Sequence, residues 1–367
     1  MRTPMCRARK TISIYLFGLM VAIGVGMYQQ DSSANDSLGF SYAAISFTPD
    51  SQKLVFTRCK ADDTDCYIHI YDLKTKALSY YRPPKDQNWY AAKFSPSGKQ
   101  VVFVLAPRVP DAESSAGDSR LYTDWSKSQI AIMDADGRNI RLLTKHSGLK
   151  LLPNFSWSGK KVIYVQGEMR KPGAKTMASK WDVFEINLET GVNNQLTGFK
   201  FYQIGRPSYL PGDDRFVVHA LGPGKIPGVK DAVDSTYLRG FEKNFNNSRV
   251  YVFDAKPGAQ KLEPLFSQFL NASNPGVDSY GNLYFSAQPS SADRFRLFQS
   301  NTKSALHSWY LPNMQPRYTE VSPDGRYWAV ISPAAYPDDL NGIHLFEMAS
   351  DKWETVSDTT VARLINP

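Results

Sequence analysis

Few side chains in this sequence of 367 residues have the type and spacing that would let them carry out chemistry. The five histidines fall in separate segments, and no two of them have the spacing of metal ligands: His69, His146, His219, His307 and His344. The sequence contains no Gly-x-Ser-x-Gly segment, the nucleophile elbow of many serine hydrolases. We therefore expect no metal and no cofactor, and a non-enzymatic protein is the favoured interpretation.

The acidic residues give no clear catalytic pattern. Asp134-Ala-Asp-Gly137 resembles the start of a calcium loop but lacks the oxygen ligands and the glutamate that follow in such loops, so it predicts a hairpin turn. Two carboxylates from distant segments could still meet in space and cleave a glycosidic bond. The sequence leaves that alternative open.

Two of the three cysteines are placed to form a disulfide. Cys59 and Cys66 lie at the end of one predicted strand and the start of the next, and a hairpin would bring them together across residues 60–65. We predict the bridge rather than two free thiols, because an exported protein can keep a disulfide. Cys6 lies before an apolar run and has no such neighbour.

The N-terminus has the layout of an export signal. Four basic residues precede an uncharged, mostly apolar run at residues 11–28, and small residues follow at Ser32 and Ala34. We predict that residues 1–34 are a signal peptide; the alternative is a retained inner-membrane anchor, since about 18 residues can just span a bilayer. In both cases the remaining chain lies outside the cytoplasm, in the periplasm or secreted. Contact with a membrane is expected only through this segment, if it is retained.

Composition indicates a large folded core and a modestly basic surface. Hydrophobic residues make up 42% of the chain and aromatic residues 13%, which excludes a disordered protein. The formal net charge is +8 and falls to +5 without residues 1–34. No concentrated Lys/Arg stripe with interleaved aromatic residues is present, so nucleic acid is not an expected partner.

A repeated turn predicts the fold that must position any site. Phe94-Ser-Pro-Ser-Gly-Lys99 precedes an apolar run, and similar segments recur at residues 48–53 and 322–326, with weaker copies at 156–160, 210–213 and 278–282. Each copy lies between two strand-like runs, and two more such runs follow. We predict an all-β, six-bladed β-propeller of four-stranded antiparallel blades over residues 35–367, and a monomer.

The best-preserved unit combines Phe94-Ser-Pro-Ser-Gly-Lys99, Ile130-Ala-Ile-Met-Asp-Ala-Asp-Gly137 and Arg141-Leu-Leu-Thr144. This combination resembles the TolB-like (WD40-like) propeller repeat. The resemblance implies a periplasmic protein-binding scaffold, although the same repeats also form the gating propeller of prolyl-oligopeptidase-type enzymes. A full TolB protein has an α/β domain before its propeller, and we expect this chain to be a TolB-like propeller without that domain.

Long connections indicate which face binds a partner. The longest lie between the second and third strands of their blades, at residues 106–128, 167–180 and 221–247, and in a propeller these share a face with one mouth of the channel. The candidate binding residues on these connections are Tyr122, Trp125, Arg170, Lys171, Lys175 and Arg239. A second set lies where the inner strands enter the channel, and its alternative role is to join adjacent blades: Tyr90, Asn154, Arg206, Asn274 and Arg317.

These observations favour an exported, non-enzymatic propeller that binds an envelope protein or peptide through its long-loop face and channel mouth. The alternative is an enzyme or lectin-like binder acting on an acidic polysaccharide, whose carboxylates the basic loops would contact. A third interpretation is a structural propeller that uses its rim within a larger assembly.

Overall fold

The computed structural model describes residues 40–60, 65–110, 121–169, 178–222, 247–258, 260–300, 306–311, 314, 316–332 and 342–356. The predicted signal or anchor, residues 1–34, lies outside this part of the chain. Among the described residues, no helix is both long and apolar enough to cross a bilayer.

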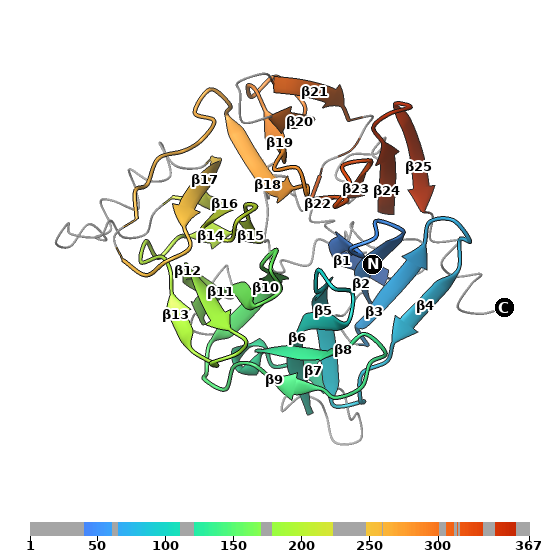
Figure 1. Cartoon of the computed structure of the whole chain (residues 1–367), viewed down its shortest axis with the longest axis vertical. Coiled ribbons are helices and arrows are strands. Elements are labelled where there is room, and N and C mark those ends of the chain that lie inside the picture. Colours follow the sequence, from blue (N-terminus) through green and yellow to red (C-terminus); the bar gives the residue numbers. More distant parts are fainter. Residues whose placement is uncertain are drawn as a thin grey trace, which may run out of the picture.

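Six antiparallel sheets surround a central axis, which confirms the predicted six-bladed β-propeller (Figure 1). Blade one consists of β1 (Phe40–Phe47), β2 (Lys53–Lys60), β3 (Tyr67–Asp72) and β4 (Leu78–Tyr81). Blade two consists of β5 (Gln87–Phe94), β6 (Gln100–Pro110), β8 (Gln129–Asp134) and β9 (Arg141–Leu142), and β7 (Leu121–Thr123) also pairs with β6. Blade three consists of β10 (Leu149–Phe155), β11 (Lys161–Met169), β12 (Ala178–Asn187) and β13 (Asn193–Gln195). A single 3₁₀ turn, η1 (Trp125–Lys127), precedes β8.

The remaining blades follow the same order around the ring. Blade four consists of β14 (Gln203–Ile204), β15 (Ser208–Tyr209), β16 (Arg215–Leu221) and β17 (Ser248–Asp254). Blade five consists of β18 (Asn271–Val277), β19 (Leu283–Gln288), β20 (Arg296–Ser300) and β21 (Leu306–Tyr310). Blade six consists of β22 (Tyr318–Val321), β23 (Tyr327–Ser332), β24 (Gly342–Glu347) and β25 (Lys352–Val356). Blade four differs from the others. Its inner strand is divided into β14 and β15, and the chain beyond β17 returns to the sheet as an isolated bridge between Tyr251 and Pro264.

The repeated segment forms the turn between the first and second strands. In blade two the Gly98 amide donates to the Ser95 carbonyl at 2.8 Å, and the Ser95 hydroxyl accepts the Gln100 amide at 3.1 Å. Gly98 has a φ of 70°, a conformation that glycine adopts without a Cβ penalty. The Ser-Pro-x-Gly pattern is therefore a hairpin turn whose serine and glycine have separate tasks.

Apolar packing between neighbouring blades forms the core and closes the ring. The first and last blades share one cluster of buried side chains, in which Tyr42 and Ile45 pack with Ala329 and Ile331. Each blade consists of strands that are consecutive in the described part of the chain, and within that part no strand is shared between the first and last blades.

In blade one, Cys59 and Cys66 are joined by a disulfide across the β2–β3 hairpin. Both cysteines are completely buried. The bridge contacts the inner strand of blade two, because the Tyr90 hydroxyl lies 2.7 Å from Cys66 Sγ. It therefore fixes the end of a hairpin that packs against the inner strand of blade two.

Candidate binding site on the channel axis

The innermost strands pack side by side around the axis (Figure 1). Four of them carry a β-bulge at which one residue other than glycine has a left-handed backbone: Ala44 (φ 48°), Ala91 (52°), Leu152 (53°) and Asn274 (51°). A bulge of this kind changes the direction of the side chains beside it, and it recurs at the same place in several blades. The inner strands are thus built to turn particular side chains toward the axis.

The turn motif defines equivalent positions around the channel. Each copy of the turn begins with one residue that follows the inner strand: Thr48, Ser95, Ser156, Leu210, Asp278 and Ser322. The residue two positions before it lies near the end of that strand, which gives one equivalent position in each blade: Ser46, Lys93, Asn154, Ser208, Gly276 and Glu320. Lys93 and Glu320 are its two charged members, and they form a direct ion pair from blade two to blade six. Their side chains are only 17% and 9% exposed, so the pair is largely withdrawn from water.

Arg206 extends this pair into a cluster that crosses the channel. It lies at the break between β14 and β15, donates from Nη1 to the Ile45 carbonyl of blade one at 2.8 Å, and approaches Glu320 Oε2 at 3.4 Å. The cluster therefore has two cations for one carboxylate. Burial lowers the pKa of Lys93, Glu320 opposes that effect and Arg206 adds to it.

His219 approaches the same point from the second strand of blade four. An added Cβ on Gly205 would lie 1.9 Å from the His219 ring, so the imidazole occupies space that exists only because residue 205 is glycine. The ring's Nδ1 accepts the Asn274 amide at 2.9 Å. Burial lowers the pKa of His219 to about 4, so the imidazole is neutral near pH 7 and carries its proton on Nε2.

A small cavity of about 20 Å³ lies between these groups. Its lining comes from five blades: Ile45, Leu152, Gly205, Arg206, His219, Asn274, Pro275, Tyr318, Thr319 and Glu320. Three buried nitrogens beside it, Arg206 Nε, Arg206 Nη2 and His219 Nε2, have no hydrogen-bond partner among the described residues. Buried donors are normally paired, so this concentration of unpaired donors is unusual.

The structure brings together two of the residues expected from the sequence, Arg206 and Asn274. Asn154 instead donates from Nδ2 to the Pro207 carbonyl and to Ser208 Oγ, both at 3.2 Å, which is the blade-joining role. The rings of Tyr90 and Trp125 pack against each other in the core with 4.6 Å between their centroids, and both residues are buried. Arg317 precedes β22 and lies over the Tyr318 ring, with 5.9 Å between its guanidinium carbon and the ring centroid.

The other candidates lie outside the described residues: Arg170, Lys171, Lys175 and Arg239. Tyr122 is in β7, but its side chain is not among those described. The strands around these connections extend beyond the blade, since Met169 pairs with Ala178 and Pro110 pairs with Leu121. The long connections therefore begin as hairpins at the end of the blades where the inner strands start.

Sequence reasoning missed Lys93, Glu320 and His219. Lys93 and Glu320 could have been found by counting back two residues from each turn, because that step gives one layer of the channel. His219 gives no such signal, since a histidine in a strand usually packs against its neighbours. Within the described residues, no group of three or more His, Cys, Asp and Glu side chains could hold a metal ion.

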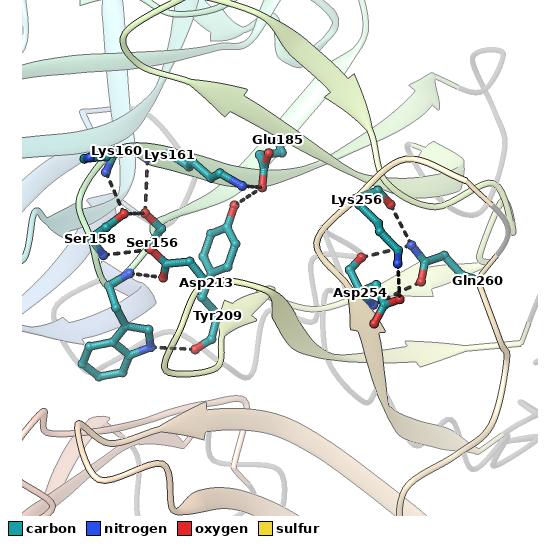
Figure 2. Close-up of polar contacts among 11 residues, drawn as sticks. Ser156, Ser158, Lys160, Lys161, Glu185, Tyr209, Asp213, Asp254, Lys256 and Gln260 are labelled. Atoms are coloured by element: carbon teal, nitrogen blue, oxygen red, sulfur yellow. Dashed lines mark hydrogen bonds and ion pairs between the residues drawn. The ribbon is translucent and has the colours of Figure 1, made fainter.

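A second polar cluster, which shares no residue with the cavity lining, joins blades three and four (Figure 2). The Asp213 carboxylate accepts the amides of Trp157 at 2.6 Å and Ser158 at 2.9 Å. The Tyr209 hydroxyl donates to Glu185 at 2.6 Å, and Lys161 lies 3.2 Å from the same carboxylate oxygen. All of these groups have partners within the protein, so the cluster is a structural tie between blades.

No family model matches the sequence. Among solved structures, TolB from Acinetobacter baumannii is similar over 86% of this chain and 62% of its own, with 13% sequence identity and a TM-score of 0.55. This chain has the fold of a TolB-like propeller. The chain spans 62% of the length of that TolB protein.

Enzymes share the same architecture. An oligogalacturonate lyase in complex with manganese matches 86% of this chain and 76% of its own at 12% identity, with a TM-score of 0.52. A puromycin-hydrolyzing peptidase from Mycobacterium tuberculosis matches 86% of this chain and 44% of its own at 16% identity, with a TM-score of 0.51. Identities this low show the fold alone, and a propeller fold does not determine function.

Proposed function

We propose that this chain is an exported, non-enzymatic binding propeller whose partner is an envelope protein or peptide, bound at the channel mouth on the face of the long connections. The observation that carries this proposal is the set of buried donors on the axis, at Arg206 and His219, that lack acceptors among the described residues. Such donors are a binding feature, because a ligand can supply the missing acceptors.

The position of the cavity supports entry from the long-connection face. Leu149 at the start of β10 pairs with Gly167, next to the connection that follows β11, so inner strands start on that face. Most of the lining residues, such as Leu152, Arg206 and Tyr318, precede the layer of Lys93 and Glu320 along their strands. The cavity therefore lies on the long-connection side of the ion pair.

The same site gives little support to hydrolysis of a polysaccharide. Glu320 is the one carboxylate among the lining residues, and it is already paired with Lys93 and Arg206. Glycosidases ordinarily need two carboxylates that face the bond to be cleaved. Export of the mature chain rests on the signal-like layout of residues 1–34.

The test is affinity capture from envelope extracts with the mature protein, followed by direct binding to the captured protein after purification. Arg317→Glu reverses a charge next to Tyr318, which lines the cavity, and Arg138→Glu does the same on a turn of the opposite face, where the Arg138 side chain is 80% exposed. A partner that binds wild type and Arg138→Glu, but not Arg317→Glu, supports the proposal. Identical binding to all three proteins would place the partner elsewhere, and turnover of an acidic saccharide would make the protein an enzyme.

A further inference from the structure

We propose that the channel axis holds a carboxylate-binding site, in which Arg206 Nε and Nη2 together with His219 Nε2 donate to one carboxylate of a bound peptide. This inference rests on the proposed function and names the chemical group that the channel recognises. The three nitrogens are buried and have no acceptor among the described residues. They belong to two side chains that line the same cavity.

The geometry of Arg206 favours a carboxylate over a single acceptor atom. Nη1 is occupied by the Ile45 carbonyl at 2.8 Å and by Glu320 at 3.4 Å. The two remaining nitrogens, Nε and Nη2, carry N–H groups on the same edge of the planar guanidinium. That edge presents two nearly parallel donors, which match the two oxygens of a carboxylate.

His219 adds a donor that is held in place by its neighbours. Because Nδ1 accepts the Asn274 amide at 2.9 Å, the proton of the neutral ring is on Nε2. The side chain is 3% exposed, and the absent Cβ of Gly205 gives the ring its space. The imidazole is therefore oriented before any ligand arrives.

Charge and size select the class of ligand. Lys93 and Arg206 outnumber Glu320 in the cluster, so one further negative charge would balance it. A volume of about 20 Å³ exceeds the roughly 10–15 Å³ that one water requires, but it is too small for a sugar ring. A carboxylate on a slender chain offers two acceptors without bringing a ring into this space, and a peptide has one at its C-terminus or on an Asp or Glu side chain.

The experiment uses the purified protein and defined probes. Wild type, labelled with ¹⁵N in its five histidines, is titrated with N-acetyl-trialanine, which has a free C-terminus, and with its C-terminal amide. N-acetyl-glutamate amide tests a side-chain carboxylate, and galacturonate tests an acidic sugar. The His219 Nε2 signal, assigned by its loss in His219→Gln, is expected to shift with the free acid or the glutamate probe, and not with the trialanine amide.

Variants separate recognition from folding. Arg206→Lys keeps a cation but loses the paired donors, and we expect binding of the acid, measured by calorimetry, to weaken about 10- to 100-fold. Gly205→Ala displaces the imidazole and should weaken binding while leaving Arg206 in place. Arg138→Lys on the far turn is the matched control and should bind as wild type does.

Equal binding of acid and amide, or unchanged affinity in Arg206→Lys, would overturn the inference. Binding of galacturonate but of neither peptide acid would overturn the peptide class. Failure of this inference is distinct from failure of the proposed function. A partner protein whose binding needs Arg317 but is unaffected by Arg206→Lys would leave the proposed function standing and remove the carboxylate site.

Discussion

The buried imidazole of His219 makes a quantitative prediction about acid stability. Burial lowers its pKa to about 4, against an ordinary value of 6.5, so the unfolded chain binds more protons than the folded protein between those two pH values. Stability from this group is therefore complete above about pH 6.5 and is lost as the pH falls toward 4. The difference of about 2.5 between the two pKa values corresponds to about 3 kcal/mol of unfolding free energy.

The perturbation is His219→Gln, which replaces the imidazole with a side chain that does not titrate. Urea unfolding at pH 7, 6, 5 and 4 gives the free energy of unfolding of both proteins. We expect wild type to lose about 3 kcal/mol more than the variant across this range. His69, whose pKa burial also lowers to about 4, acts in the same direction, and Asp182, whose pKa burial raises to about 6, acts in the opposite one. Both are present in the two proteins, so the difference isolates His219.

The matched control is His307→Gln, because His307 is exposed on β21. Its unfolding free energy at pH 7 should equal that of wild type, which checks that loss of a histidine side chain does not by itself destabilise the protein. Parallel curves for wild type and His219→Gln would refute the reasoning, since they would mean that the imidazole takes up its proton at the same pH in the folded and unfolded states. The reasoning would also be refuted if the free energy of unfolding fell at low pH in His219→Gln but not in wild type.

Three further predictions concern stability elsewhere. Replacing both Cys59 and Cys66 with serine opens a bridge between residues 7 apart in sequence and should cost about 2.5 kcal/mol by chain entropy, measured by urea unfolding, with the unreduced wild type as reference. Asp213→Ala removes the acceptor of the Trp157 and Ser158 amides and should lower the unfolding free energy by about 2 kcal/mol, whereas Asp136→Ala on an exposed turn should leave the melting temperature unchanged. Burial lowers the pKa of Lys150 to about 8, so between pH 8 and about 10.5 the unfolded chain binds more protons than the folded protein, and the stability of wild type should rise with pH. Lys150→Met should not show this gain, and equal gains in both proteins would contradict the assignment.

The fold could be predicted from sequence because its signal is repeated. A Ser-Pro-x-Gly turn followed by an apolar run fixes one hairpin, and recurrence of that turn fixes the number of blades. Even the weak copy at residues 278–282 forms such a turn, because the Asp278 carboxylate accepts hydrogen bonds from the amides of Tyr280 and Asn282, both at 2.9 Å. Local chemistry determines such turns, so a single sequence is enough to find them.

The axis was harder to predict because its contacts join distant segments. Arg206 and Asn274 were expected near the channel from their place on inner strands, but the same argument also selected Asn154, which joins two blades. His219 reaches the cavity only because Gly205 leaves space and Asn274 offers an amide 55 residues away. Neither condition is visible in the strand pattern around the histidine.

The seam between the first and last blades has a mechanical consequence. Blade one is joined to blade six by apolar packing, by the Asp324 amide, which donates to Ser51 Oγ at 3.2 Å, and by an exposed ion pair of 2.6 Å between Lys76 and Glu354. The Lys93–Glu320 pair passes behind blade one and connects blade two directly to blade six. Outward movement of blade one would therefore break the contacts at the seam but would leave blades two and six connected to each other through Lys93 and Glu320. Among the described residues no strand is shared across this seam, and the direct contact between blades two and six means that loosening of blade one alone need not open the ring.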